Sequence, residues 1–429
     1  MNIYKMSQMQ NIPTISNYQN NDNKLTFTLY GVDVSFANSI RRTILADVKT
    51  VVFRTTPYEE NQANITVNTT RLNNEILKQR LSCTPIHITN ISKEELDNLV
   101  LEVDEENLTE SMMVVTTEHF KVKNKRTNSY LSKKDSQTIF PPYIAPNGVE
   151  YFVEFVRLRP KISEDILGEK IKFTCNFSIG TAKENCMFNV VGTCAYGFTV
   201  DNDQARSELT VKQQKWRAEQ MTPENIDYES KNWLLLEAKR YTIKNSFDFV
   251  LESVGVFENE TIVRIACQAL IDKFQGLIRE IDEGKFKVNL MVTKTPNTFD
   301  YILTNEDYTI GTVLNHLLYK NYFEGIGSIL YCGFKKMHPH DTDSIIRLTF
   351  KMEEQPSAGL EYIKACSMEA IGVFDSIMKK FRADADIQGY NLPDVEMKMR
   401  EPAIPAKKVA QRKQPEEEID FDIEEDEDA

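Results

Sequence analysis

Two segments of this chain carry the same order of hydrophobic and polar residues. Residues 33–45 read DVSFANSIRRTIL, and residues 307–319 read DYTIGTVLNHLLY. In each segment a hydroxyl residue, Ser35 or Thr309, comes just before apolar residues at helical spacing. Those apolar residues are Phe36, Ile40 and Ile44 in the first segment and Ile310, Leu314 and Leu318 in the second. The pattern predicts two helices, each with a hydroxyl N-cap and one buried face.

The patterns around these two segments are also alike. An alternating run that predicts a strand precedes each segment, at residues 25–29 and 299–303. A long amphipathic helix is predicted later in each unit, because apolar residues again recur at helical spacing. Its apolar positions are Val263, Ala266, Leu270, Phe274, Leu277 and Ile281 in the first unit and Ile363, Ala370, Phe374, Ile377 and Phe381 in the second. A repeated unit of strand, helix and long helix predicts two similar domains that face each other.

The apolar helix faces are the expected contact between these two domains. The interface of this internal pseudo-dimer is expected to contain Phe36, Ile40, Ile44, Leu270, Phe274, Leu277, Ile310, Leu314, Leu318, Phe374 and Ile377. Because each domain would already have its partner in the same polypeptide, no homodimer is expected.

Changes of pattern along the chain predict its organisation. Strand-like runs alternate with turn-rich loops between the two parts of the first unit, which indicates an inserted domain, and insertion at an exposed loop costs a fold little. The predicted segments are a flexible N-terminus (1–22), a discontinuous first unit (23–87 and 241–285), a mainly β inserted domain (88–240), a second unit (286–390) and a disordered tail (391–429). The fold class is therefore predicted as α+β, with two related units in one chain.

Composition and charge narrow the classes of protein. Of the 429 residues, 41% are hydrophobic and 27% are charged, as in soluble proteins. No stretch is apolar over the roughly 18 residues of a membrane span, and no secretory leader is evident, so an intracellular protein without membrane contact is expected. Seven scattered cysteines fit a reducing compartment. The net charge is −13, but residues 415–429 alone contain ten acidic and no basic side chains. The rest of the chain is therefore close to neutral. A nearly neutral protein is not expected to bind the phosphate backbone of a nucleic acid by itself.

Two small clusters could carry chemistry of their own. His338, His340 and Asp341 are possible metal ligands, so a stand-alone metal-binding or hydrolase protein centred on them is the alternative function. Cys83 and His87 could pair as nucleophile and base, but no third residue is evident to orient them. No Walker lysine loop or Gly-rich phosphate cradle occurs. The sequence therefore predicts a chain without catalytic residues.

Several short motifs resemble those of the α-like subunits of multisubunit DNA-directed RNA polymerases. In the first unit they are NSIRRTIL (38–45), VNTTRL (67–72), Glu75, QRL (79–81), LRP (158–160), GE (168–169), GTAKE (180–184) and FVLESVG (249–255). These are similar to the third subunit of RNA polymerase II and to its archaeal counterpart. The second unit resembles the eleventh subunit and the archaeal counterpart of that subunit, through NEDYTIG (305–311) and GFKKMHPH (333–340). Its motif residues are Glu306, Asp307, Thr309, Gly311, His338 and Pro339. The fusion of the two resembles what some large DNA viruses carry.

This resemblance implies a role in assembly. It implies a non-catalytic α-like platform that binds the second-largest (β-like) and the largest catalytic subunits, together with small subunits similar to the tenth and twelfth. This chain would contact DNA only indirectly, through the polymerase complex. The catalytic magnesium would lie on the largest subunit, so no cofactor is expected on this chain. If viral, the chain is expected in host cytoplasm and virion; otherwise it is expected with the polymerase in nucleus or cytoplasm.

The resemblance also implies which residues face partners. Asn38, Arg41 and Arg42 would lie against the β-like subunit, and Arg80, Lys183 and Glu184 are further candidates for the subunit interface. Adjacent guanidiniums cannot both point into the apolar side of one helix, so at least one must leave it, and arginine suits bidentate pairing with a partner. The alternative is that these arginines form salt bridges inside the platform.

Two further features depart from, or add to, the family pattern. Many third-subunit relatives hold a zinc or iron–sulfur cluster in the inserted domain, but no cysteine occurs between residues 84 and 174, so no metal is expected here. In the acidic tail, Ile419, Phe421 and Ile423 alternate with carboxylates. The tail is either a solubilising appendage or a short interaction motif, and the sequence leaves both open.

Overall fold

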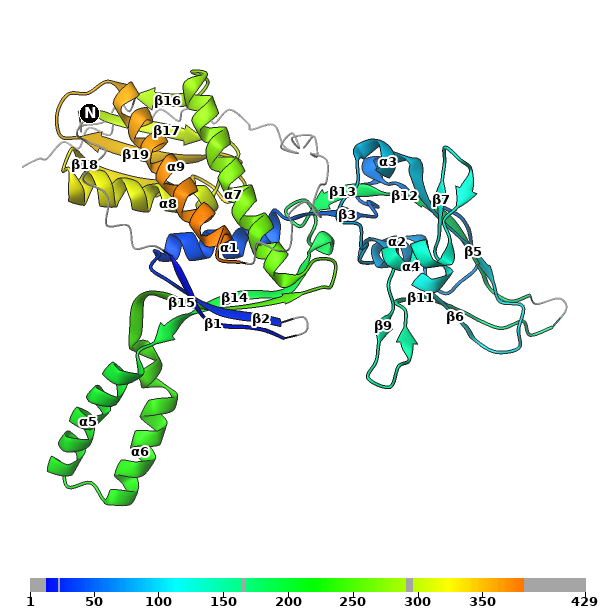
Figure 1. Ribbon diagram of the computed structural model, residues 1–429, viewed down its shortest axis with the longest axis horizontal. Helices are drawn as coiled ribbons and strands as arrows, with labels where there is room; N and C mark the ends of the chain where they lie inside the picture. Colours follow the sequence, from blue (N-terminus) through cyan, green and yellow to red (C-terminus); the bar gives the residue numbers. More distant parts are fainter. Residues whose placement is uncertain (1–12, 22–23, 164–166, 291–295, 382–429) are drawn as a thin grey trace, which may run out of the picture. The chain divides into compact units, whose positions relative to one another are not determined.

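A computed structural model describes residues 13–21, 24–163, 167–290 and 296–381 of the chain (Figure 1). Helices and strands are mixed, in agreement with the predicted α+β class. The predicted disordered tail, residues 391–429, and residues 1–12 lie outside the described residues. In the described part of the chain, no helix is both long enough and apolar enough to cross a membrane.

The first unit is a four-stranded antiparallel sheet with two helices. The strands lie in the order β1 (Thr14–Asn21), β2 (Lys24–Tyr30), β15 (Thr242–Ser253) and β14 (Val191–Val200). Helix α1 (Val34–Ala46) follows β2, and helix α7 (Asn259–Asp282) follows β15. Alternate residues of β2 and β15 turn to one face of the sheet and are buried, because successive side chains of a strand point to opposite sides. They are Leu25, Phe27, Leu29, Phe247, Phe249 and Leu251.

The second unit has the same topology. Its strands lie in the order β16 (Lys287–Leu290), β17 (Thr298–Leu303), β19 (Ser344–Phe350) and β18 (Ile329–Lys335). Helix α8 (Tyr308–Leu318) follows β17, and helix α9 (Pro356–Met378) follows β19. In both units the strand before the short helix and the strand before the long helix are the two inner strands. The repeat seen in the hydrophobic pattern therefore extends to the order of the strands.

The two units share one hydrophobic core. Helix α7 lies against α9, and α1 lies against α8 (Figure 1). Within this core the rings of Phe36 and Phe374 are 5.3 Å apart, and those of Phe274 and Phe374 are 6.0 Å apart. All eleven residues predicted at the internal interface are buried in it. Since a fully buried Leu, Ile or Phe side chain contributes roughly 1.5–3 kcal/mol, this shared core is a large part of the stability of both units.

A second core lies in the segment that connects α1 to β14. Its elements are β3 (Lys49–Val52), β4 (Ala63–Asn68), α2 (Asn74–Ser82), α3 (Lys93–Asn98), β5 (Leu99–Glu106), β6 (Met113–Thr116), β7 (Lys121–Asn124), β8 (Ser129–Tyr130), α4 (Lys133–Ile139), β9 (Tyr143–Ile144), β10 (Glu150–Tyr151), β11 (Glu154–Leu158), β12 (Lys170–Asn176) and β13 (Ser178–Thr181). The largest sheet has the order β4-β12-β5-β7-β8, and β11-β6, β13-β3 and β10-β9 are two-stranded. Short turns of 3₁₀ helix lie at Tyr58–Glu60, Thr117–His119 and Cys186–Phe188.

The inserted part begins and ends earlier than the predicted limits of 88 and 240. Val51, Phe53, Leu77 and Leu81 were expected in the first unit, but they pack in the second core with the apolar residues of β5 and β12. Strand β14, expected in the insertion, pairs with β15 in the sheet of the first unit. The insertion therefore connects α1 to β14, and the strand at Lys49–Val52 belongs with it.

A second, helical insertion lies between β14 and β15. Helices α5 (Asn202–Ala218) and α6 (Pro223–Leu235) and a 3₁₀ turn at Glu237–Arg240 replace the β structure predicted there. They pack on a small cluster built on Ala205, Trp233 and Ala238. The second unit has only a π-helical turn, η6 (Tyr319–Gly325), and a loop at the two equivalent connections.

The predicted flexible N-terminus is ordered from Thr14 onward. Strand β1 pairs along β2 although most of its side chains are polar and exposed. An edge strand is held by backbone hydrogen bonds on one side, so a polar sequence can form it. Its polarity is what led to the wrong prediction for residues 14–21.

Close packing between α8 and β18 gives a stability test at Gly311. A Cβ added at Gly311 would lie 1.9 Å from the ring of Phe334, whereas one added at Gly372 in α9 would meet nothing within 4 Å. We expect Gly311→Ala to lower the unfolding free energy by about 1–3 kcal/mol through overpacking. Gly372→Ala, the matched control, should be neutral or stabilising by up to about 1 kcal/mol, because alanine favours a helix. Chemical denaturation measures both; equal effects would contradict this packing.

Candidate functional site

Each of the two repeat helices begins with an aspartate cap, Asp33 or Asp307. The side chain of Asp33 accepts a hydrogen bond from the backbone N–H of Ser35 at 2.9 Å, and Asp307 accepts one from Thr309 at 2.8 Å. The predicted hydroxyl caps, Ser35 and Thr309, instead lie buried in the first turn. A cap side chain must reach an N–H two or three residues ahead, and the aspartates, not the hydroxyls, are in that position.

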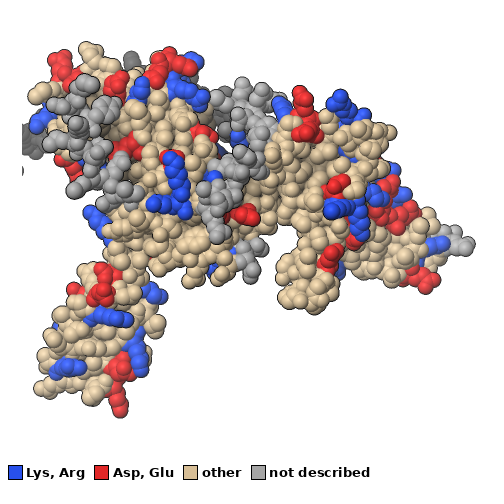
Figure 2. Space-filling view, in the orientation of Figure 1, with Lys and Arg blue, Asp and Glu red and all other residues tan. Residues whose placement is uncertain are grey.

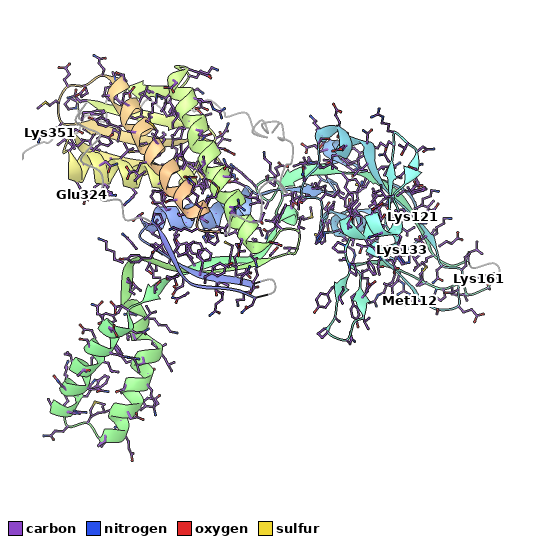
Figure 3. The ribbon with its side chains drawn as sticks, in the orientation of Figure 1. Met112, Lys121, Lys133, Lys161, Glu324 and Lys351 are labelled. Carbon is purple, nitrogen blue, oxygen red and sulfur yellow. The ribbon has the colours of Figure 1, made fainter. Side chains whose placement is uncertain are left out.

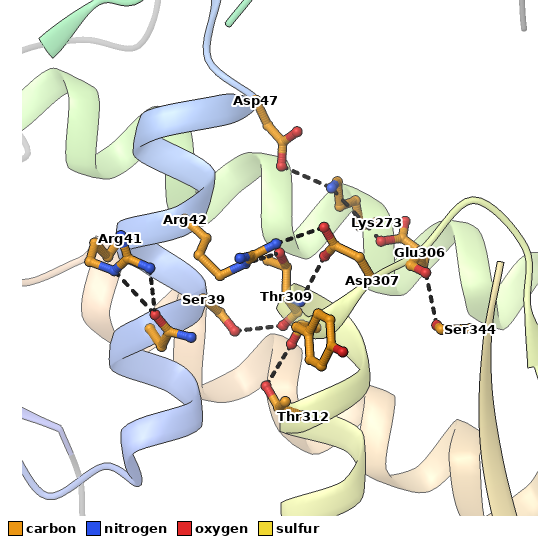
Figure 4. Close-up of polar contacts among 12 residues, drawn as sticks. Ser39, Arg41, Arg42, Asp47, Lys273, Glu306, Asp307, Thr309, Thr312 and Ser344 are labelled. Carbon is orange, nitrogen blue, oxygen red and sulfur yellow. Dashed lines mark hydrogen bonds and ion pairs between the residues drawn. The ribbon is translucent and has the colours of Figure 1, made fainter. Parts of the chain in front are cut away.

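Each aspartate cap lies next to a side chain from the other short helix. Arg42 of α1 donates through Nε to Thr309 Oγ1 at 3.0 Å and through a terminal nitrogen to Asp307 Oδ2 at 2.7 Å (Figure 4). His316 of α8 lies with Nδ1 3.6 Å from Asp33 Oδ1.

These two contacts are equivalent by sequence position. Arg42 and His316 each stand nine residues after the cap of their own helix. In a two-fold interface, when residue i contacts residue j, the equivalent j contacts the equivalent i. Helices α1 and α8 therefore pack as two subunits of a symmetric dimer do. Sequence reasoning assigned no role to His316, although its equal spacing from Asp307 was visible beside that of Arg42 from Asp33.

A wider polar network joins the long helix α7 to the end of α1 and the start of α8. Lys273 of α7 lies 2.9 Å from Asp47 Oδ2, just after α1, and 3.8 Å from Glu306 Oε2, just before α8. The carbonyl of Glu306 accepts a hydrogen bond from Ser344 Oγ at 2.8 Å. Figure 4 shows these residues around the start of α8. The polar contacts thus fix the register of the two units beside the apolar core.

The Arg42–Asp307 pair is charged near neutral pH. Burial would raise the pKa of Asp307, but hydrogen bonds from Thr309 and the charge of Arg42 outweigh it and lower the pKa to about 2. Burial lowers the pKa of His316 in spite of the nearby Asp33 carboxylate. The first contact is therefore an ion pair near neutral pH, and the second is a contact to an imidazole that favours its neutral form.

The Lys273 part of the network shifts two further groups. Burial alone would lower the pKa of Lys273, but the carboxylates of Glu306 and Asp47 together raise it, so the ammonium is favoured. Burial raises the pKa of Glu306, against the attraction of Lys273 and Lys183. A lysine between two carboxylates offsets part of the cost of taking their charges out of water.

The two adjacent arginines of α1 point to opposite sides of the helix (Figure 4). Arg42 turns toward α8 and forms the internal salt bridge that was the alternative interpretation. Arg41 instead donates twice to the amide oxygen of Asn38 on its own helix, at 3.1 and 2.9 Å. Both Asn38 and Arg41 are half-buried. Arg41 is therefore the arginine whose guanidinium is turned away from the second unit.

The other predicted interface residues do not gather at one place. Arg80 donates to the backbone carbonyls of Glu154 and Phe155 in the second core, at 2.9 and 2.6 Å. Glu184 accepts from Arg54 at 2.6 Å. Lys183 is exposed, and its backbone N–H donates to the carbonyl of Ala46 at the end of α1. A subunit interface at these three residues stays a prediction.

The clusters considered for other chemistry do not form a site. The rings of His338 and His340 stack 5.0 Å apart in an exposed turn. Among the described residues, no group of three or more His, Cys, Asp or Glu side chains is placed to hold a metal ion. Burial and the neighbouring Cys186 raise the pKa of the Cys83 thiol, which disfavours the nucleophilic thiolate. Neither the metal-binding alternative nor the thiol nucleophile is supported.

The charge of Asp307 gives a pH-dependent test. Because the folded-state pKa is held at about 2, below the ordinary value of 3.8, the stabilisation is complete above the ordinary value and is lost as the pH falls through about 2. Asp307→Asn keeps a capping oxygen but removes the charge. For a side chain that is 28% exposed, we expect it to lower the unfolding free energy at neutral pH by about 1–2 kcal/mol, after allowance for solvent screening.

Chemical denaturation at pH 7 and pH 3 measures this effect, and the loss should be smaller at pH 3. Asp375→Asn is the matched control, since Asp375 pairs with Lys379 at 2.6 Å on the exposed side of α9. It should change stability by less than about 0.5 kcal/mol. A loss at Asp307 no larger than at Asp375 would contradict the role of the cross-helix pair.

Comparison with known proteins gives a consistent result. The family described as RNA polymerase Rpb3/Rpb11 dimerisation domain matches residues 26–274. The chain is 24% identical over 302 residues to DNA-directed RNA polymerases I and III subunit RPAC1 of Bos taurus, covering 61% of this chain and 82% of that protein. It is also 24% identical over 281 residues to DNA-directed RNA polymerase subunit Rpo3 of Pyrococcus horikoshii, covering 61% of this chain and 94% of that protein. With a match over more than half of its length, the chain belongs to the RNA polymerase Rpb3/Rpb11 dimerisation domain family.

Proposed function

We propose that this chain is a non-catalytic assembly subunit of a DNA-directed RNA polymerase and carries both halves of an α-like dimer in one polypeptide. The observation that carries the proposal is the reciprocal contact of two caps, Arg42 with Asp307 and His316 with Asp33. Membership of the family supports a polymerase subunit. The identical strand order of the two units supports a fusion of two related halves.

Fusion changes how the platform forms. Two separate halves must meet by diffusion, whereas two halves in one chain meet at an effective concentration set by their linker. Only a few residues separate the end of α7 at Asp282 from the start of β16 at Lys287. The shared core is then filled within one chain, so the proposed platform is a monomer until it meets other subunits.

The exposed side of α1 is the proposed contact for the β-like subunit. Asn38 holds the guanidinium of Arg41 in place through two hydrogen bonds. The other N–H groups of this guanidinium can then donate to a partner. A positioned guanidinium recognises carboxylates or carbonyls bidentately. Val34, on the same helix, is 39% exposed and adds apolar surface. Arg42 takes no part in this contact, because its guanidinium is bound to Asp307.

The remaining partners follow from the proposed role. The platform would also hold the largest subunit, which would carry the catalytic magnesium, and small subunits similar to the tenth and twelfth. DNA would be reached only through the complex. A viral origin, with the chain in host cytoplasm and virion, is proposed from the fusion of the two units.

Affinity purification at high salt tests the assembly role. We expect the tagged full-length chain, purified from its native source, to bring down two very large subunits in stoichiometric amounts. Recovery of the chain alone as a stable monomer would overturn the proposal.

The contact at Arg41 has its own test. Arg41→Glu should weaken recovery of the β-like subunit at least about tenfold, as expected when a hydrogen bond to a charged group, worth about 1.5–3 kcal/mol, is replaced by a repulsive charge. Arg126→Glu, at an exposed position beyond β7, is the matched control and should have no effect. A melting temperature equal to that of the unchanged chain shows that Arg41→Glu is folded. Unchanged recovery would remove Arg41 from the interface.

A further inference from the structure

The β9–β10 hairpin of the second core exposes apolar side chains on a sheet of two strands. Tyr143 pairs with Tyr151 and Ile144 pairs with Glu150. Tyr143 is 68%, Ile144 63% and Tyr151 56% exposed. In the part of the chain that the structure describes, β9 and β10 pair only with each other. A lone two-stranded hairpin is at best marginally stable in water, so other interactions must hold this one in shape.

Local contacts fix the shape of the hairpin before any partner binds. In its turn, the N–H of Ala145 donates to the carbonyl of Val149 at 2.9 Å, and that of Gly148 donates to the carbonyl of Ala145 at 2.8 Å. Gly148 has a φ of +79°, which glycine adopts without strain. At its base, the N–H of Thr117 donates to the carbonyl of Val153 at 2.9 Å. A side chain presented on a fixed backbone loses little entropy on binding.

The chemistry of the hairpin selects the kind of partner. Residues 136–153 contain no lysine or arginine, and Glu150 is their only charged residue. A segment without cations cannot neutralise nucleic-acid phosphates, and it lacks the basic residues that attract anionic lipid. The nearby Lys121 and Lys133, labelled in Figure 3, belong to other elements and pair with Glu105 and Glu118. Figure 2 shows that the hairpin region is mostly free of charge.

We propose that the β9–β10 hairpin is a docking element that inserts Tyr143 and Tyr151, which are paired on one face of the hairpin, into an uncharged apolar cleft on another subunit of the polymerase. The inference rests on the proposed function, which supplies the partner subunits. Exposed apolar patches mark protein contacts, and tyrosine is among the residues that carry most binding energy at interfaces. The face that carries Tyr143 and Tyr151 is uncharged and complements an uncharged cleft, because Glu150 lies with Ile144 on the opposite face.

Photo-crosslinking within the assembled polymerase tests the proposal. A benzoylphenylalanine in place of Tyr143, in the full chain purified with its polymerase, should crosslink to one other subunit, at a segment rich in apolar residues. Tyr228 of α6 is the matched control, because it is also 68% exposed. Crosslinking at position 228 to that subunit should be at least about tenfold weaker.

Two variants give a second measurement. Tyr143→Ser with Tyr151→Ser should lower recovery of the crosslinked subunit at least about tenfold, with the melting temperature of the free chain unchanged; Tyr228→Ser should leave recovery unchanged. Crosslinks from position 143 to this chain or to a second copy of it, or none in a recovered polymerase, would overturn the inference and leave the proposed function standing. Failure to recover any polymerase subunit would overturn the proposed function itself.

Discussion

The contact between α1 and α8, in which each aspartate cap lies against a residue of the other helix, is the constraint on which the packing of the two units depends. An aspartate at a helix N-terminus is stabilised by the unpaired N–H groups and by the helix dipole. Its remaining lone pairs must still find a partner when the helix end is partly buried. Arg42 supplies that partner for Asp307, and the imidazole of His316 lies 3.6 Å from Asp33. Because Arg42 comes from the other helix, its bonds to Asp307 and Thr309 form only when the two units pack in one register. Apolar faces alone tolerate small shifts of register, and the polar pairs remove that freedom.

Neither insertion disturbs the packing of α1 against α8. One joins α1 to β14 and the other joins β14 to β15, and neither interrupts a helix of the shared core. In the second unit the same two connections are the π-helical turn at Tyr319–Gly325 and a loop before β19. Because the cost of closing a loop rises slowly with its length, a long insertion at either connection leaves the dimer-like core in place. The inserted second core is thus free to present its own surfaces, such as the β9–β10 hairpin.

Sequence patterns predicted the parts of the fold that strict periodicity encodes. The helices at residues 34–46 and 308–318 and the two long helices have one apolar face each, and their eleven interface residues are buried together. The pattern could not tell which core an apolar residue joins, so Val51 and Leu77 were placed in the wrong unit. Helix α5 has few buried residues, and its polar sequence resembles a loop. The caps were misplaced because Ser35 and Thr309 are also good capping residues, and only the backbone shows that the aspartates come first.

The two units differ in sequence, so their equivalent faces can also differ, which the faces of identical subunits cannot do. Asn38 and Arg41 of α1 correspond by position to Thr312 and Asn315 of α8. On α1 this face presents a guanidinium held by an amide. On α8, the hydroxyl of Thr312 donates to the carbonyl of Tyr308 at 2.6 Å, and the side chain of Asn315 lies 3.3 Å from the sulfur of Cys332. These two side chains are uncharged, and both are bonded within the second unit. The two equivalent faces therefore differ in charge, and they could select different partners in the proposed role. Because both units belong to one chain, every copy of the protein has one face of each kind.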